Sequence, residues 1–208
     1  MIRCEEIMAW VRELDLVYQS NKASLTELDA AIGDADHGIN MVRGFSAAAK
    51  ELSEQTPPDI GAILKALAMI LMKKVGGASG PLYGTFFLKA SMTCNGRTSI
   101  GAEDLVVLFE AGVAGIRQRG KAKEGDKTMI DAWEPAVRAM REAFSGGGDV
   151  SEILRAAVSA GESGRDATIS LAARKGRASY LGERSRGHQD PGATSAVLML
   201  KAARDTLA

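Results

Sequence analysis

Three carboxylates gather in one short stretch among glycines and apolar residues: Asp29, Asp34 and Asp36. On one continuous helix of about 3.6 residues per turn their side chains would point in different directions. Gly33 and Gly38 interrupt the helical pattern, so the first carboxylate can leave a helix end while the other two fold back from a turn. A lone Asp-x-Asp is usually a pair of helix caps on a solvated turn. The third aspartate, with a histidine and an asparagine in the same stretch, favours a cation site instead.

Magnesium fits this stretch better than calcium. Mg²⁺ takes six oxygen ligands, commonly one or two carboxylates completed by water and phosphate. A calcium loop that began at Asp34 would need an oxygen ligand at its fifth position, glycine at its sixth and glutamate at its twelfth, where the chain has Gly38, Ile39 and Phe45. The sequence therefore predicts one or two Mg²⁺ ions that neutralise the phosphates of a bound ligand.

A second stretch that could bind a ligand is the run Gly76-Gly77-Ala78-Ser79-Gly80, followed by Pro81. Unobstructed N–H groups and a hydroxyl at the start of a helix suit an anion such as phosphate. The run lacks the Walker lysine and follows a helix rather than a strand, which excludes the P-loop and the dinucleotide fingerprint. A tight turn between two helices is the structural alternative.

Five cations lie in a third stretch, between residues 174 and 192. Guanidinium groups there can meet phosphate oxygens in pairs. A solubilising surface loop is the alternative, and we prefer it for Arg184 and Arg186. Asp190-Pro191 also has a structural explanation, an N-cap followed by proline at the first helical position. No nucleophile–base pair is indicated by spacing.

Apolar residues at helical spacing predict an all-α fold of about eight amphipathic helices that position these stretches. A capping-box match, Ser24-x-x-Glu27, is expected to open the second helix, and the penultimate helix has candidate breaks at Gly161 and Gly164. Alternating β-branched runs are scarce, so a sheet is not expected. The expected helices are 2–19, 24–32, 37–52, 60–75, 81–92, 103–119, 129–144, 151–173 and 191–207.

Composition narrows the class of protein. A length of 208 residues suits one domain over residues 1–208. The 26 acidic and 26 basic residues cancel, which gives no reason to expect nucleic acid or an acidic membrane as partner. The most apolar window is too short to span a bilayer. Cys4 and Cys94 show no metal or disulfide spacing, and we expect a cytoplasmic protein in which both are small buried side chains.

Four blocks in order resemble the L subunits of dihydroxyacetone kinases, and the similarity extends over essentially the whole chain. The blocks are Gly33-Asp34-Ala35-Asp36-His37-Gly38-x-Asn40-Met41, Gly76-Gly77-Ala78-Ser79-Gly80-Pro81-x-Tyr83-Gly84-Thr85, Gly125-Asp126-Lys127-Thr128-Met129, and Gly176 to Arg184 continued by Asp190-Pro191-Gly192-Ala193-Thr194. The resemblance implies an antiparallel barrel of eight helices with an adenine nucleotide, ADP or ATP, and two Mg²⁺ ions at one end.

By position, the resemblance also implies site residues. Asp29, Asp34 and Asp36 match metal ligands, and Arg177 and His37 match the groups at the transferring phosphate. The nucleotide contacts that it implies are His37, Gly38, Ile39, Asn40, Ala78, Ser79, Gly120, Met129, Arg177, Asp190, Pro191 and Gly192. Catalysis of this kind rests on positioning and charge neutralisation.

The partners follow from the resemblance as well. The triose is expected on a separate K subunit, and ADP is expected to be recharged from phosphoenolpyruvate by the phosphotransferase-system M subunit. Two alternatives stay open: an L subunit of an ATP-dependent two-subunit kinase for dihydroxyacetone or a ketotetrose, and a catalytically silent module that senses nucleotide. A homodimer is also left open, and the short ketose cannot be identified from this chain.

Overall fold

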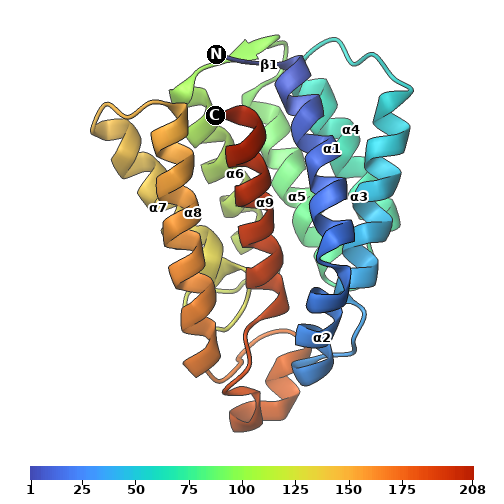
Figure 1. The fold of residues 1–208 in the computed structure, drawn as a ribbon, viewed down its shortest axis with the longest axis vertical. Helices are drawn as coiled ribbons and strands as arrows, with labels where there is room; N and C mark the ends of the chain where they lie inside the picture. The colour runs from blue at the N-terminus through green and yellow to red at the C-terminus, as the bar shows by residue number, and fades with distance from the viewer.

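The computed structural model describes residues 1–208, and eight long helices form its body (Figure 1). A ninth, shorter helix, α2, extends beyond one end of them. The α-helices are α1 (Cys4–Ser20), α2 (Lys22–Ile32), α3 (His37–Ser53), α4 (Ile60–Lys74), α5 (Ser79–Thr93), α6 (Ala102–Gly120), α7 (Ile130–Ser145), α8 (Val150–Ala167) and α9 (Pro191–Leu207). Two 3₁₀ segments, η1 (Thr168–Ser170) and η2 (Arg177–Ser185), lie between α8 and α9.

The eight long helices close into a ring. Each packs on the next in the order α1, α3, α4, α5, α6, α7, α8, α9, and α9 packs back on α1. Successive helices of the ring run in opposite directions (Figure 1). Both termini therefore lie at one end of the ring, while α2, η1 and η2 lie at the other (Figure 1). This arrangement confirms the predicted all-α antiparallel barrel.

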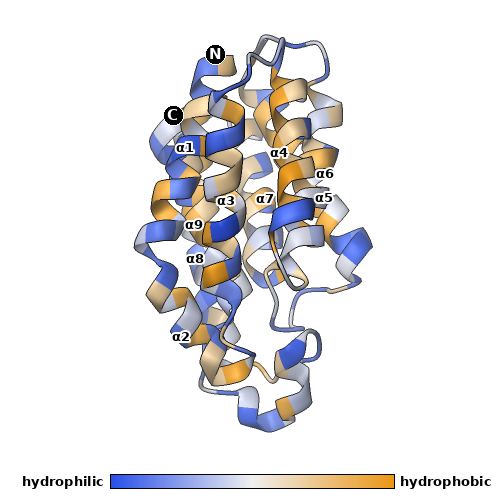
Figure 2. Cartoon of the chain, turned by 90° about the vertical axis from the view of Figure 1, so that its right-hand side faces the viewer, coloured by the Kyte–Doolittle hydropathy of each residue, from blue (hydrophilic) through white to orange (hydrophobic).

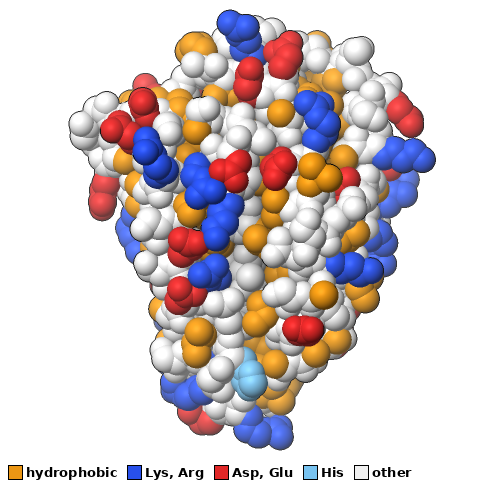
Figure 3. Space-filling model, viewed as in Figure 1, with side chains coloured by type: hydrophobic (Ala, Val, Ile, Leu, Met, Phe, Trp, Pro, Cys, Tyr) orange, Lys and Arg blue, Asp and Glu red, His pale blue; other side chains and the backbone are white.

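Aromatic side chains fill the interior of the ring. Trp133 stacks on Phe86 with ring centroids 5.1 Å apart, and Trp10 lies 5.6 Å from Phe87. Hydrophobic and hydrophilic stretches alternate along the long helices in Figure 2, as expected of helices with one buried face. Acidic and basic side chains are interspersed on the face shown in Figure 3, in agreement with zero net charge. No helix is both long and apolar enough to cross a membrane.

Two expected boundaries were wrong. The second helix begins at Lys22 after Asn21, so Ser24 lies inside it and is not the cap. The penultimate helix ends at Ala167 and is unbroken at Gly161 and Gly164. A Cβ at Gly164 would overlap the backbone oxygen of Asp131, so this glycine allows α8 to approach α7 closely instead of breaking the helix.

A minimal sheet is present although none was expected. Strands β1 (Ile2–Arg3) and β2 (Ser99–Ile100) pair antiparallel, with Ile2 opposite Ile100. Two residues per strand are too few to leave an alternating pattern in the sequence. The pair ties the start of the chain to the connection before α6, so residues 98 and 99 do not lead directly into a helix.

Candidate functional site

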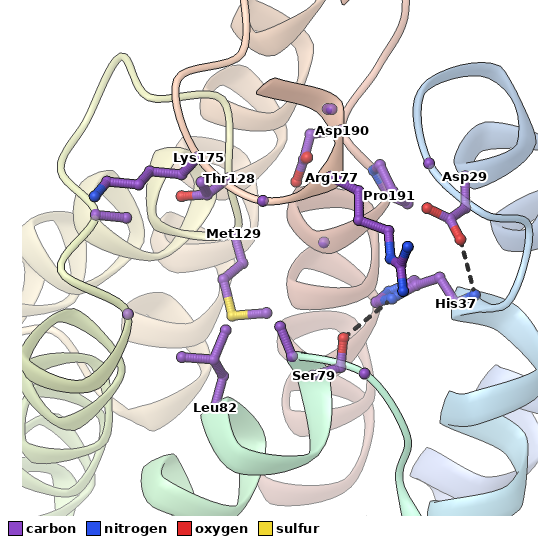
Figure 4. A pocket seen from close by; sticks show the side chains of 18 of the residues that line it. Asp29, His37, Ser79, Leu82, Thr128, Met129, Lys175, Arg177, Asp190 and Pro191 are labelled. Carbon is purple, nitrogen blue, oxygen red and sulfur yellow. Dashed lines mark hydrogen bonds between the residues drawn. The ribbon is translucent and has the colours of Figure 1, made fainter. Parts of the chain in front are cut away.

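A large cavity lies at the end of the ring away from the termini. Its volume is about 830 Å³. Its walls come from the α2–α3 turn, the glycine run before α5, the end of α6, the connection before α7, the segment before and within η2, and the start of α9. Figure 4 shows side chains from these separate elements facing one space. The three stretches that the sequence singled out therefore meet.

The α2–α3 turn brings the three carboxylates together. Ligand oxygens of Asp29, Asp34 and Asp36 all lie within 4.8 Å of one another. Asp29 lies in the last turn of α2, and its Oδ2 accepts hydrogen bonds from the backbone N–H groups of Asp36 (2.9 Å) and His37 (3.1 Å). A Cβ at Gly33 would overlap Asp29 Oδ1, which explains why glycine follows the helix here.

The donor set of this turn fits magnesium. All three groups offer hard carboxylate oxygens, and three such charges at this spacing repel one another unless a cation neutralises them. Arg177 supplies part of that neutralisation, because its Nε lies 3.0 Å from Asp34 Oδ2. The remaining carboxylate charge is suited to a divalent ion that also binds phosphate.

The glycine run forms the wall beside the carboxylates. Gly77 has φ +63°, a conformation that favours glycine, and α5 begins at Ser79. The first N–H groups of a helix have no partner within it, so those of α5 are available to an anion. A Cβ at Gly76 would meet Asn40 Oδ1 at 2.6 Å, which shows how closely the run packs on α3.

Three residues that the resemblance placed at the nucleotide do not line the cavity: Gly38, Ile39 and Asn40. Gly38 packs α3 against the backbone of α2. The side chain of Asn40 is buried behind the glycine run, where its Oδ1 accepts a hydrogen bond from Arg43 at 2.6 Å. Gly38 and Asn40 thus support the walls of the cavity, whereas Ile39 is exposed. Contact of these three residues with a nucleotide stays a prediction.

His37 is buried at the edge of the cavity. Its Nδ1 lies 3.2 Å from Ser79 Oγ, and its Nε2 lies 2.9 Å from Ser195 Oγ (Figure 4 shows the first of these). Burial lowers the pKa of His37, although the nearby carboxylates of Asp29 and Asp36 oppose that shift. The neutral ring is therefore favoured at pH 7.

The opposite wall is more apolar and includes Gly120, Leu82, Met129 and Pro191. A Cβ at Gly120 would approach Leu82 Cδ2 to 3.2 Å, so glycine keeps this wall open. Asp190 caps α9 by accepting a hydrogen bond from the backbone N–H of residue 193 at 2.7 Å, with proline next, as the sequence indicated. Burial raises the pKa of Asp190 to about 7.

Sequence reasoning missed Lys127 as a site residue. Its side chain is 1% exposed, and its ammonium donates to the backbone oxygens of Thr168 (2.7 Å), Leu171 (3.1 Å) and His188 (2.5 Å). The ammonium thus holds η1 and the segment before α9 over the cavity. The lysine belongs to the block Gly125 to Met129, but nothing in the sequence indicates that it is buried.

Two cations of the third stretch, Arg184 and Arg186, lie at the surface as expected, whereas Arg174 and Lys175 line the cavity. Arg184 and Arg186 are exposed, and Arg186 pairs with Glu183 at 2.5 Å. His188 is exposed too. Of the two cysteines, Cys94 is buried and Cys4 is partly buried, and both are free. Burial raises the pKa of each thiol.

The ring of helices with this site at one end is a DAK2 domain: the model of that family matches residues 31–205. The ADP-binding subunit DhaL of the PEP-dependent dihydroxyacetone kinase of Escherichia coli K12 is 48% identical over 94% of this chain and 93% of its own length. The corresponding PTS-dependent subunit of Lactococcus lactis is 40% identical over the full length of both. This chain belongs to the family of dihydroxyacetone kinase L subunits, DhaL.

A solved structure agrees with this assignment. The dihydroxyacetone kinase of C. freundii in complex with AMP-PNP and Mg²⁺ superimposes with a TM-score of 0.72 at 26% identity. The match covers 96% of this chain and 33% of that kinase, so the chain spans about a third of the solved enzyme.

Proposed function

We propose that this chain is the nucleotide-binding subunit of a multi-subunit dihydroxyacetone kinase. It holds ADP or ATP with two Mg²⁺ ions and passes the terminal phosphoryl group to dihydroxyacetone bound on a separate K subunit. The observation that carries the proposal is one cavity that joins three converging carboxylates to the free N–H groups at the start of α5. The names of the relatives, ADP-binding subunits of such kinases, support it.

Each group of site residues has a role that suits its chemistry. Asp29, Asp34 and Asp36 would hold the Mg²⁺ ions, which when bound neutralise charge on the phosphates. Backbone N–H groups at Ala78 and Ser79 would donate to the phosphates, and the guanidinium of Arg177 would pair with their charge. Fixed donors around the transferring group lower the barrier because they need no rearrangement during the reaction.

The apolar wall would receive the adenine. Gly120 and Met129 offer flat and flexible apolar surface, and Asp190 to Gly192 close the space beside them. A Cβ at Gly192 would lie 3.0 Å from Asp190 Oδ2, so a larger residue there would press on the carboxylate that caps α9.

The phosphoryl source is proposed to be phosphoenolpyruvate, delivered by a phosphotransferase-system M subunit while ADP stays bound. The relatives with PEP- or PTS-dependent names match over nearly their whole length, and this supports the version with retained ADP over an ATP-exchanging kinase. We also propose a cytoplasmic location, where phosphoenolpyruvate is available and both thiols stay free.

Reconstitution tests the proposal. The purified chain is mixed with a K subunit and dihydroxyacetone, first with the M subunit, the phosphotransferase proteins and phosphoenolpyruvate, and then with Mg·ATP alone. Sugar phosphate in the first mixture, together with ADP released in equal amount when the purified chain is denatured, is the expected result. Sugar phosphate only with Mg·ATP identifies the exchanging kinase. Sugar phosphate in neither mixture leaves a silent nucleotide-sensing module.

Variants of the chain locate the site in the same assay. Asp34→Ala and Asp36→Ala are expected to abolish nucleotide retention and transfer while helical content is kept. Asp205→Ala is the matched control, because Asp205 is an exposed aspartate at the far end of α9. If the Asp34 and Asp36 variants kept their ADP, the carboxylates would be structural.

A further inference from the structure

A buried chain of polar groups runs from the cavity edge into the ring. It passes from Ser79 on α5 to His37 on α3 and then to Ser195 on α9. The Ser195 hydroxyl also lies 2.7 Å from the Tyr83 hydroxyl, and both residues are fully buried. The proposed function assigns no role to Ser195 or Tyr83.

Counting hydrogens fixes the direction of each bond. A serine hydroxyl has one hydrogen and two lone pairs. Ser195 Oγ donates its hydrogen to the backbone oxygen of Gly192 at 2.9 Å, which as a carbonyl can only accept. Its two remaining partners, Tyr83 and His37, must then both donate to it. The nitrogen of His37 that faces Ser195 therefore carries the hydrogen.

The other ring nitrogen is consequently bare. A neutral imidazole carries a hydrogen on one nitrogen only, so Nδ1 of His37 accepts, and the Ser79 hydroxyl 3.2 Å away donates to it. The ring is buried, and both of its nitrogens face hydroxyl groups rather than carboxylates, which favours the neutral form. Both nitrogens are engaged within the protein, so neither is free to exchange a proton with a ligand.

We propose that Ser195 and Tyr83 are positioning residues that hold His37 in its Nε2–H tautomer, and that His37 acts on the nucleotide only by orienting the Ser79 hydroxyl. Ser79 then faces the cavity with its oxygen lone pairs, which suit a magnesium-bound water or another donor, while phosphate oxygens are left to the backbone N–H groups. The part of this inference that concerns the nucleotide rests on the proposed function, whereas the tautomer does not.

The tautomer can be measured directly, because the chain has only two histidines. In protein labelled with ¹⁵N-histidine and carrying His188→Gln, the ring nitrogens of His37 give one set of long-range ¹H–¹⁵N correlations. The Nε2–H pattern is expected at pH 7.5. Ser195→Ala should replace it with averaged nitrogen shifts of two exchanging tautomers, and Ser195→Thr should restore it. An Nδ1–H pattern in the parent, or an unchanged pattern in Ser195→Ala, would overturn the proposal.

Two Tyr→Phe variants form a matched pair, because each removes one hydroxyl and keeps the aromatic ring in the core. Tyr83 reaches the hydroxyl of Ser195, whereas Tyr18 donates to its backbone oxygen at 2.9 Å, and both are buried. Tyr83→Phe should shift the His37 nitrogen resonances toward the averaged values. Tyr18→Phe should shift them much less, because the hydroxyl of Tyr18 contacts Tyr83 and the backbone but not the hydroxyl of Ser195. Equal effects of the two variants would mean that packing, not the hydroxyl relay, sets the tautomer.

Binding of Mg·ADP, followed by titration calorimetry, tests the functional part. Loss of one orienting hydrogen bond corresponds to about a fivefold to tenfold weaker affinity. We expect that loss in Ser195→Ala and its recovery in Ser195→Thr. If the tautomer changes but the affinity does not, His37 does not act on the nucleotide through Ser79. If the parent chain binds no Mg·ADP while the tautomer result holds, it is the proposed function that fails.

Discussion

The guanidinium of Arg177 and the carboxylate of Asp34 form an ion pair at the mouth of the cavity, with Nε of the arginine 3.0 Å from Oδ2 of the aspartate. Their side chains are 69% and 35% exposed, so solvent screens the pair and its contribution is about 1 kcal/mol or less. Asp34 also belongs to the carboxylate cluster proposed to hold Mg²⁺. The proposed function therefore implies that arginine and metal compete for the same carboxylate until a phosphate is present to receive the arginine.

Replacing Arg177 should move two affinities in opposite directions. Without nucleotide, Arg177→Gln is expected to bind Mg²⁺ about twofold to fivefold more tightly, because the competing cation is gone. The same variant should bind Mg·ADP about tenfold more weakly, because a charge-assisted contact to phosphate is lost. Calorimetric titrations of Mg²⁺ and of Mg·ADP measure both quantities. Arg184→Gln, an exposed arginine of the same segment, is the control. A fall in both affinities would exclude competition.

Removal of Asp29 should lower the free energy of unfolding more than removal of Asp34. Asp29 Oδ2 accepts two backbone hydrogen bonds, from Asp36 and His37, whereas Asp34 pairs with an exposed arginine. Asp29→Ala is expected to lower the free energy of unfolding by about 1–3 kcal/mol, because it leaves those donors without a partner. Asp34→Ala should cost about 0.5 kcal/mol or less. Urea unfolding of the metal-free proteins checks the difference, and equal losses would contradict it.

The buried ammonium of Lys127 should control the segment between η1 and α9. Lys127→Met keeps the aliphatic bulk but leaves three carbonyls without a donor, and we expect a loss of about 2–4 kcal/mol in the free energy of unfolding. Hydrogen exchange in that segment should accelerate more than in α4, which lies away from it. Lys123→Met, at an exposed site in the same connection, is the control. Uniform acceleration throughout the chain would mean that Lys127 does not hold this segment locally.

The helices were predictable because their apolar spacing is local. Their ends were harder to predict, as Gly161 and Gly164 show. A glycine inside a helical pattern is ambiguous in sequence, since it either interrupts a helix or lets a neighbour approach, and the neighbour decides. Here Leu200 lies against one and the backbone at Asp131 against the other. Similarly, Ser24 has the spacing of a cap but lies one turn inside a helix that Asn21 begins.

The site too combines features that local sequence predicts with features that only the tertiary structure reveals. Convergence of Asp29, Asp34 and Asp36 followed from a glycine break within eight residues, which is local information. The contact between His37 and Ser195 joins residues 158 apart, and Lys127 reaches carbonyls up to 61 residues away. No spacing rule connects such positions, so only the folded ring reveals them.

Asp190 links the stability of the fold to pH. Burial raises the pKa of this carboxyl from its ordinary 3.8 to about 7 in the folded chain, so between these values the folded state binds a proton that the unfolded state releases. Stability from this proton is complete below about pH 4 and is lost as the pH rises through 7. Three pKa units correspond to about 4 kcal/mol, and the value of about 7 already includes the lowering of the pKa by the nearby ammonium of Lys127.

Asp190→Asn tests this dependence, because asparagine keeps the cap of α9 but does not titrate. The stability of the parent relative to this variant should decrease by up to about 4 kcal/mol between pH 4 and pH 7.5, measured by urea unfolding at several pH values. Asp149→Asn at the exposed cap of α8 should show a much smaller change over the same range. If the difference between the parent and Asp190→Asn stays constant with pH, the carboxylate of Asp190 is already ionised at pH 4, and the ammonium of Lys127 then compensates its buried charge.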